Sequence, residues 1–169
     1  MFKLSNRSLS RLETGHPDGN AVVERAIKYT AVDFGVGEVA RSIEKQRQNV
    51  ELGASTTMNS RHLPKMTKKC IVGEMPLIPV AHAWDLFAYV DGQARWELPL
   101  YLEIAKAMDK ASTELGVPMR WGACWQLLSE IEFDNYMSHI TTYIQNKKAL
   151  GKKALVDGPH FELPWQDYP

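Results

Sequence analysis

The sequence predicts a single domain that contains both α-helices and β-strands. Its 169 residues are enough to bury one substantial core. Hydrophobic residues make up 44% of the chain and charged residues 24%, which are ordinary values for a globular protein. Segments whose apolar residues recur three and four positions apart, as in helices, occur beside short apolar or alternating segments, as in strands.

The first third of the chain is expected to hold three helices and one strand. Residues 5–12 form a short predicted helix, and the turn at residues 17–20 leads into a second at 21–29, where apolar residues recur at three and four. Alternating residues at 33–39 favour a half-buried strand. Residues 43–52 then return to helical spacing, so the strand is followed by a third helix.

The second half contains the clearest helical pattern. Residues 98–115 carry one apolar stripe, with Pro99 near the start and Gly116 directly after the end. Residues 83–89 are predicted to form a buried strand and residues 117–121 a short one. Helices and strands therefore alternate irregularly along one domain.

Asp85 is the one carboxylate in an otherwise apolar predicted strand. Burial of an unpaired carboxylate is costly, and a metal or a cationic partner would offset that cost. Two histidines, His62 and His160, are candidates to join it, because two imidazoles and one carboxylate leave a metal with an open position for a water. The three residues lie far apart in sequence, and surface histidines are common, so spacing alone is equally compatible with structural roles.

Composition excludes several other classes of function. Lys plus Arg (20) equals Asp plus Glu (20), so the overall charge favours neither nucleic acid nor a membrane surface as partner. The amino terminus is polar from Lys3 onward and lacks a signal peptide's apolar core, and no apolar run reaches transmembrane length. Cys70 and Cys124 are too few for a disulfide framework; we expect free thiols, with a bridge that pins residues 64–81 as the alternative.

Three segments resemble the motif blocks of zinc peptidoglycan peptidases that include phage L-alanyl-D-glutamate endolysins. The segments are Ser-Arg-His-Leu at 60–63, Ala-Trp-Asp-Leu at 83–86 with Tyr-Val-Asp-Gly at 89–92, and Asp-Gly-Pro-His-Phe-Glu-Leu at 157–163. The amino-terminal residues 2–12 and the His-Pro-Asp at 16–18 are similar to the start of the same endolysins. The resemblance therefore covers most of the chain, in order.

This resemblance implies an α+β fold, with helices packed on a small antiparallel sheet, as in Hedgehog/DD-peptidase-like proteins. It implies one zinc peptidase catalytic domain over residues 1–169, without a separate cell-wall-binding domain. By position in the motifs it assigns His62, Asp85 and His160 as Zn²⁺ ligands and Asp157 as the general base. It assigns Arg41 to stabilise the oxyanion or to bind a substrate carboxylate, and Ser60 and Gln46 as supporting substrate contacts.

The chain also departs from the family pattern. His62 and Asp85 are much farther apart than in typical members, so residues 64–81 are an apparent insertion, expected to form an irregular flap with an apolar underside. A second insertion, at residues 127–156, is expected to be helical. Cys124 stands where the family has aspartate, and Val39 where glycine is usual.

Two further histidines, His82 and His139, are weaker candidates for metal ligands. His82 adjoins the second motif block, but the family has no ligand at that place, so we rank it below His62. His139 lies on or near the apolar stripe of the predicted helix in the second insertion. His139 is expected to be a packing residue, whereas His82 stays a lower-ranked candidate ligand.

The function implied by the resemblance is zinc-dependent hydrolysis of the L-alanyl-D-glutamate bond of peptidoglycan stem peptides, for host-cell lysis. The enzymatic alternative is a D-alanyl-D-alanine carboxypeptidase or dipeptidase. Two other classes are a non-catalytic zinc-binding module on this fold and a structural component of a phage particle. We expect a monomer that is made in the host cytoplasm and reaches peptidoglycan after holin-type release, without nucleic acid or stable membrane insertion.

Overall fold

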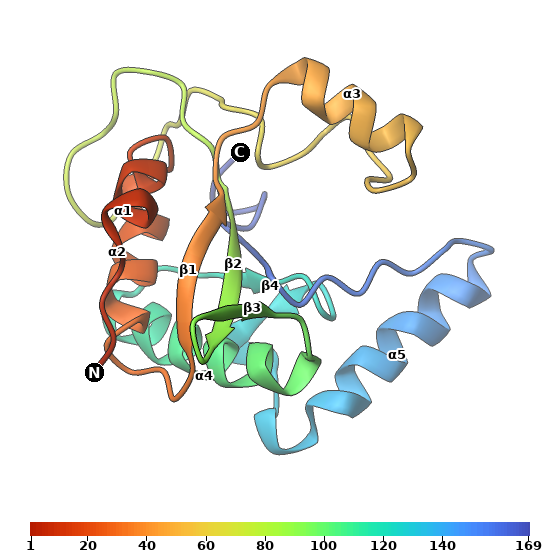
Figure 1. The fold of residues 1–169 in the computed structure, drawn as a ribbon. Coiled ribbons are helices and arrows are strands. Elements are labelled where there is room, and N and C mark those ends of the chain that lie inside the picture. The colour runs from red at the N-terminus through yellow and green to blue at the C-terminus, as the bar shows by residue number, and fades with distance from the viewer.

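An antiparallel sheet of six strands organises the computed structural model, which describes residues 1–169 (Figure 1). The strand order is β1-β2-β6-β4-β5, and β3 pairs with the carboxyl-terminal part of β2. The strands are β1 (Asp33–Glu38), β2 (Ala83–Val90), β3 (Gln93–Arg95), β4 (Arg120–Trp121), β5 (Gln126–Leu127) and β6 (His160–Glu162). The predicted α+β class with a small antiparallel sheet is confirmed.

Five α-helices and two short 3-10 helices complete the fold. They are α1 (Asn6–Leu12), α2 (Pro17–Ala26), α3 (Ile43–Glu51), α4 (Leu98–Leu115), α5 (Tyr136–Ala149), η1 (Leu128–Glu130) and η2 (Phe133–Asn135). Helices α2 and α4 pack against each other, while α3 and α5 project on the same side of the molecule (Figure 1). No helix combines the length and hydrophobicity needed to cross a membrane.

The two faces of the sheet have different roles because side chains alternate along each strand. Trp84 and Leu86 of β2 and Phe161 of β6 are fully buried in the main hydrophobic core with residues of α2 and α4. Asp85 and His160 occupy the alternate positions and lie on the other face. That face carries the candidate site.

Helix α4 shows how closely local sequence sets an element. It spans Leu98–Leu115 as predicted, with Pro99 in the first turn, where its missing N–H costs nothing. It ends at Gly116, whose φ of 65° is left-handed and favours glycine. Helix α2 begins earlier than predicted, at Pro17, because the His16 side chain caps it by accepting a hydrogen bond from the Asp18 N–H.

The first insertion, residues 64–81, is irregular as expected, and an isolated bridge between Lys65 and Val80 closes its base. The predicted apolar underside is wrong. Four of its apolar side chains are exposed, at 55%, 44%, 92% and 64% for Met66, Met75, Leu77 and Ile78. Polar contacts hold this segment to the domain instead, through Asp18.

The second insertion, residues 127–156, is helical as expected and contains η1, η2 and α5. Its apolar stripe is only partly covered: Ile140 is buried, whereas Met137 and Ile144 are exposed. Helix α5 therefore stands away from the main core, as Figure 1 shows.

Candidate metal centre and catalytic cleft

The three predicted metal ligands converge on one point. His62 Nε2 lies 3.2 Å from Asp85 Oδ1 and 3.3 Å from His160 Nδ1, and His160 Nδ1 lies 3.1 Å from Asp85 Oδ1. Asp85 and His160 are direct partners in the pairing of β2 with β6. His62 approaches from the loop that follows α3, where its carbonyl accepts a hydrogen bond of 2.9 Å from the Arg41 N–H.

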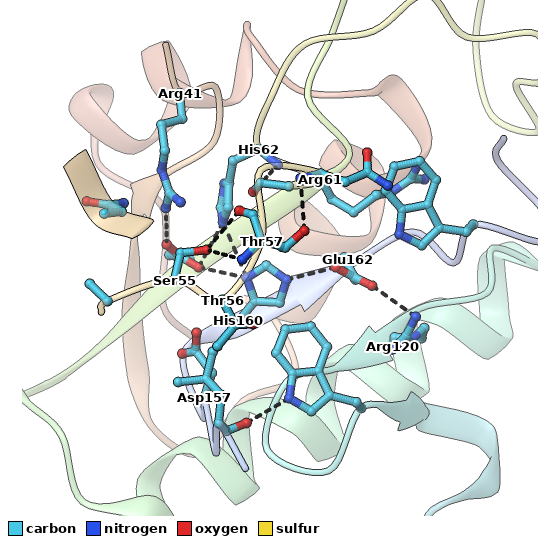
Figure 2. A pocket seen from close by; sticks show the side chains of 18 of the residues that line it. Arg41, Ser55, Thr56, Thr57, Arg61, His62, Arg120, Asp157, His160 and Glu162 are labelled. Carbon is cyan, nitrogen blue, oxygen red and sulfur yellow. Dashed lines mark hydrogen bonds and ion pairs between the residues drawn. The ribbon is translucent and has the colours of Figure 1, made fainter. Parts of the chain in front are cut away.

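Hydrogen bonds on the far sides of both rings fix which nitrogens face inward. His62 Nδ1 lies 2.7 Å from the Val39 carbonyl and donates to it, which leaves the Nε2 lone pair directed at the centre. His160 Nε2 donates to Glu162 Oε2 at 3.0 Å, which leaves its Nδ1 lone pair directed there too (Figure 2). With the Asp85 carboxylate, three acceptor atoms therefore face one another.

Three mutually facing acceptors repel unless a proton or a cation lies between them, so the donor set fits a metal ion. Zinc holds such nitrogen and oxygen ligands at about 2.0–2.2 Å, which places the ligand atoms of a tetrahedron about 3.3–3.6 Å apart. The observed separations of 3.1–3.3 Å lie at the short end of that range, within about 0.2 Å of it. The three residues form a candidate metal site with a fourth position open to the cleft.

The electrostatics of the site favour a cation. Burial alone would raise the pKa of Asp85, but the imidazoles of His62 and His160 outweigh burial and hold it far below its usual range. Burial would lower the pKa of His160, but the carboxylates of Asp85 and Glu162 raise it overall. Both carboxylates are thus anionic, and Glu162 is paired with Arg120 at 3.2 Å.

Arg41 lies beside the metal ligands in a fixed orientation. Its guanidinium is paired with Glu38 and lies 3.7 Å from Asp85 Oδ2, while Nη1 donates to Gln46 Oε1 at 2.7 Å. The amide of Gln46 donates in turn to Ser55 Oγ and the Thr57 carbonyl. Gln46 is fully buried and does not line the cleft, so it positions Arg41.

Asp157 lines the cleft close to the metal ligands. Its backbone N–H donates to the Gly122 carbonyl at 3.0 Å, and a Cβ on Gly122 would lie 2.6 Å from the Asp157 carbonyl oxygen. Only glycine permits this close approach. Burial is the largest cause of the raised pKa of the Asp157 carboxyl, which suits a group that takes up and releases a proton.

A cleft of about 430 Å³ surrounds these groups. One wall is the polar loop after α3, which includes Ser55, Thr56 and Ser60; Ser60 Oγ also accepts a hydrogen bond from the His62 N–H. The opposite wall comes from the second insertion. Its lining residues there are Tyr143, Lys147, Lys153 and Leu155.

His82 and His139, the two weaker ligand candidates, lie outside the cleft. His82 is buried, with its ring centre 5.1 Å from that of His16. His139 accepts a hydrogen bond from the Glu132 N–H through Nε2 and bonds the Gln126 side chain through Nδ1. Neither contributes to the candidate metal site.

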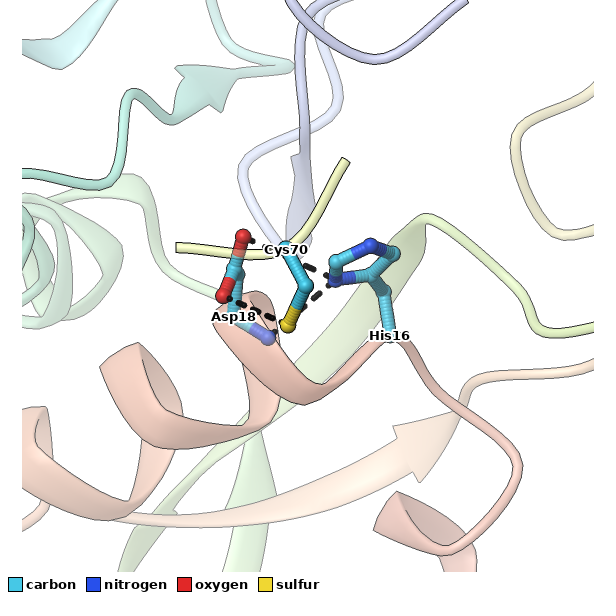
Figure 3. A group of neighbouring side chains, drawn as sticks. All are labelled: His16, Asp18 and Cys70. Atoms are coloured by element: carbon cyan, nitrogen blue, oxygen red, sulfur yellow. Dashed lines mark hydrogen bonds and ion pairs between the residues drawn. The ribbon is translucent and has the colours of Figure 1, made fainter. Parts of the chain in front are cut away.

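A second cluster, formed by His16, Asp18 and Cys70, also brings possible ligand atoms together (Figure 3). Here the lone pairs are already used. The Asp18 carboxylate accepts hydrogen bonds from the Ile71 and Val72 N–H groups, the Cys70 thiol and the Tyr168 hydroxyl, and His16 Nδ1 caps α2. We interpret this cluster as the anchor that attaches the first insertion and Tyr168 to α2. Cys70 and Cys124 are both free thiols, as expected.

Sequence reasoning missed the residues that support the site: Glu162, Arg120 and Glu38. A signal was present for Glu162, because in a strand it must share a face with His160 two residues earlier. Residues 160–162 are too few to show an alternating pattern, so the strand itself was not predicted. The pairings of Arg120 and Glu38 depend on tertiary contacts.

Comparisons with known proteins agree with the geometry. The family model described as phage L-alanyl-D-glutamate peptidase matches residues 1–164. The chain is 27% identical over 163 residues to the L-alanyl-D-glutamate peptidase of Escherichia phage T5, a match that covers 96% of this chain and 98% of that protein. It also superimposes on the crystal structure of Serratia marcescens L-Ala D-Glu endopeptidase ChiX with a TM-score of 0.68 and 30% identity, over 98% of this chain and 92% of ChiX. With the motif residues assembled around one centre and nearly the whole chain matched, the chain belongs to the phage L-alanyl-D-glutamate peptidase family.

Proposed function

We propose that the chain hydrolyses the L-alanyl-D-glutamate bond of peptidoglycan stem peptides with a zinc ion held by His62, Asp85 and His160. Family membership supports the peptidase activity. The observation that supports metal binding is that three acceptor atoms lie 3.1–3.3 Å from one another, with both imidazoles oriented by hydrogen bonds to neighbouring groups. Two imidazoles and one carboxylate, with a carboxylate behind one imidazole, are a donor set that zinc prefers.

When bound, zinc would polarise the scissile carbonyl and lower the pKa of a water molecule at its open position. Asp157 faces the same cleft, and its raised pKa suits the general base that takes the proton from the attacking water. The same carboxyl would then donate a proton to the amine of the leaving D-glutamate.

Arg41 is proposed to stabilise the negative charge that develops on the scissile carbonyl oxygen. Glu38 and Gln46 hold its guanidinium in place before substrate binds, so little reorganisation is needed during the reaction. Ser60 faces the cleft and is proposed to contact the substrate. For Gln46 we propose a positioning role in place of the substrate contact implied by the motif.

The decisive experiment measures zinc content and bond cleavage together. Purified protein is incubated with peptidoglycan and with a synthetic stem peptide, and the new amino-terminal D-glutamate is quantified. Asp85→Ala and His160→Ala should lose both zinc and activity, and His139→Ala, which removes a histidine outside the cleft, should keep both. A chelator should abolish activity and added zinc restore it. Full zinc occupancy in His160→Ala would refute the proposed ligand set.

The same assay discriminates the alternatives. A D-alanyl-D-alanine carboxypeptidase would release free D-alanine, and a non-catalytic module would bind zinc without cleaving either bond. The position of Asp157 in the cleft favours an enzyme, because a purely structural metal needs no base. We further propose that the 169-residue chain acts as a monomeric catalytic domain and reaches the cell wall by holin-type release, which gel filtration and lysis assays with and without a holin would test.

A further inference from the structure

We propose that the wall of the cleft built by the second insertion is an anion subsite, in which Lys147 and Lys153 bind the side-chain carboxylate of the third stem-peptide residue, in the part of the substrate that leaves. The inference rests on the proposed function and specifies which part of the substrate this wall recognises. The second insertion, which lies outside the family motifs, would thereby contribute to substrate specificity.

Helix α5 presents two of the cleft residues one turn apart. Tyr143 and Lys147 stand four positions apart and so share a helix face, and Lys147 Nζ lies 5.6 Å from the centre of the Tyr143 ring. The Tyr143 hydroxyl donates to the Leu155 carbonyl at 3.2 Å and accepts from the Leu155 N–H at 3.1 Å. These two hydrogen bonds fix this face of α5 against residues 153–157, the returning segment that leads from α5 back to the metal site.

The returning segment connects this wall to the catalytic residues. Lys153, Leu155 and Asp157 line the cleft, whereas the residues between them do not. This alternation is that of an extended chain, in which every second side chain shares a face. The Leu155 carbonyl also accepts a hydrogen bond of 2.7 Å from Trp125 Nε1, and the Trp125 ring lies 5.2 Å from the His160 ring. The cationic wall is therefore continuous with the metal site.

The two lysines are the unpaired cations of this wall. Three arginines also line the cleft, but none lies on this wall. Arg41 and Arg120 are each paired with a carboxylate, Glu38 and Glu162 respectively, and Arg61 donates to the Leu163 carbonyl and stacks on the Trp165 ring. Neither Lys147 nor Lys153 forms an ion pair with an acidic residue of the chain, and the cleft's own carboxylates are gathered at the metal end. The end of the cleft away from the metal thus offers positive charge to an anionic ligand.

The position of Asp157 indicates which half of the substrate lies there. The proposed proton donor to the leaving amine belongs to the same extended segment as Lys153, so the leaving D-glutamate and the residue after it should run along this wall. Four residues of extended chain span about 13 Å. That reach suits the side-chain carboxylate of a diaminopimelate-type third residue. The D-glutamate residue and the diaminopimelate side chain separate this carboxylate from the leaving amine.

The lysines adjacent in sequence to Lys147 and Lys153 provide matched controls. Lys148 and Lys152 adjoin the two proposed contacts but do not line the cleft. Kinetics would be measured for Lys147→Met, Lys153→Met and the double variant, with Lys148→Met and Lys152→Met as controls. Each would be tested on a stem peptide with diaminopimelate as third residue and on the same peptide amidated at the side-chain carboxylate.

For the acidic peptide we expect KM to rise about threefold to fivefold per cleft lysine, as for a partly exposed ion pair, with kcat unchanged. The amidated peptide should bind wild type and variants alike, and the control variants should behave as wild type. Equal KM values for acidic and amidated peptides in wild type would overturn the proposal. So would a loss confined to intact cell walls, which would indicate binding of an anionic wall polymer.

A binding measurement separates this proposal from the proposed reaction. Calorimetry with the product peptide, D-glutamyl-diaminopimelyl-D-alanine, needs no hydrolysis. Wild type should bind it more tightly than the double variant by about 9- to 25-fold, the product of two such ion-pair effects. If no stem peptide is cleaved but this difference persists, the reaction assignment fails and the subsite stands. If cleavage occurs without the difference, the subsite is refuted alone.

Discussion

The imidazole of His160 donates a hydrogen bond of 3.0 Å from Nε2 to Glu162 Oε2, on the side of the ring opposite the nitrogen that faces the metal site. Glu162 is itself held by Arg120 at 3.2 Å. Such a carboxylate fixes the tautomer of a metal-binding histidine and raises its basicity. Glu162 therefore supports the candidate metal site without being one of its ligands.

Replacement of Glu162 should weaken metal binding while leaving all three ligands in place. For Glu162→Ala we expect an affinity loss of about 10- to 100-fold, the range found for such supporting groups. Glu162→Gln, which keeps a hydrogen-bonding oxygen but no charge, should lie between Ala and wild type. Competition with a chromophoric chelator measures this directly, and an Ala variant with wild-type affinity would contradict the assigned role.

Asp157→Asn should separate chemistry from metal binding. Loss of a positioned general base costs about 10²- to 10⁴-fold in rate. Asp157 is not a metal ligand, so zinc content should stay at the wild-type level. A variant that retains most of its activity would exclude Asp157 as the base.

His82 should make the stability of the fold sensitive to mild acid. Burial, and then the positive charge of Arg61, lower the pKa of His82 from 6.5 to about 3. Since the folded state keeps this ring neutral, its contribution to stability is complete above pH 6.5 and falls as the pH drops from 6.5 towards 3. The loss is at most about 1.4 kcal/mol per pH unit.

The test compares urea unfolding of wild type and His82→Phe at pH 7.5 and pH 4.5. The His82 Nε2 atom is buried without a hydrogen-bond partner, so phenylalanine leaves no further group unsatisfied there. The variant should lose less stability on acidification than wild type. His139→Gln controls for removal of a histidine elsewhere and should keep the wild-type difference; equal losses in His82→Phe and wild type would refute the prediction.

Tyr168→Phe should loosen the anchor of the first insertion. The Tyr168 hydroxyl donates to the buried Asp18 carboxylate at 2.7 Å, and a hydrogen bond to a charged group contributes about 1.5–3 kcal/mol. We expect a loss of that size in the free energy of unfolding, with faster proteolysis of residues 64–81. Wild-type stability in this variant would show that the other donors to Asp18 suffice.

The sequence predicted those helices whose ends and apolar face are marked by residues within the helix or next to it. Helix α4 was predicted to the residue because Pro99 and Gly116 mark both ends of one apolar stripe. The family, its fold and its L-alanyl-D-glutamate peptidase activity on peptidoglycan were predicted from the motif residues and are confirmed. The metal-ligand set followed from the same motifs, and the structure brings His62, Asp85 and His160 together.

What the sequence did not reveal depends on contacts between distant residues. Asp18 holds the backbone of Ile71 and Val72, and no pattern within residues 64–81 indicates that this segment is anchored by polar groups instead of an apolar underside. The orientation of α5 is a similar case. Its periodicity predicted a helix, but only the structure shows that Lys147 faces the cleft and that Met137 is exposed.

The pairing of Asp85 with His160 across β2 and β6 links metal binding to strand alignment. A shift of β6 by one residue would turn His160 towards the core and present Phe161 to the cleft, because neighbouring side chains point to opposite faces. Only one alignment of this three-residue strand can therefore capture the ion. The metal would thus favour the native arrangement of a strand too short to align itself by hydrophobic pattern alone, and the catalytic centre would also act as a determinant of the fold.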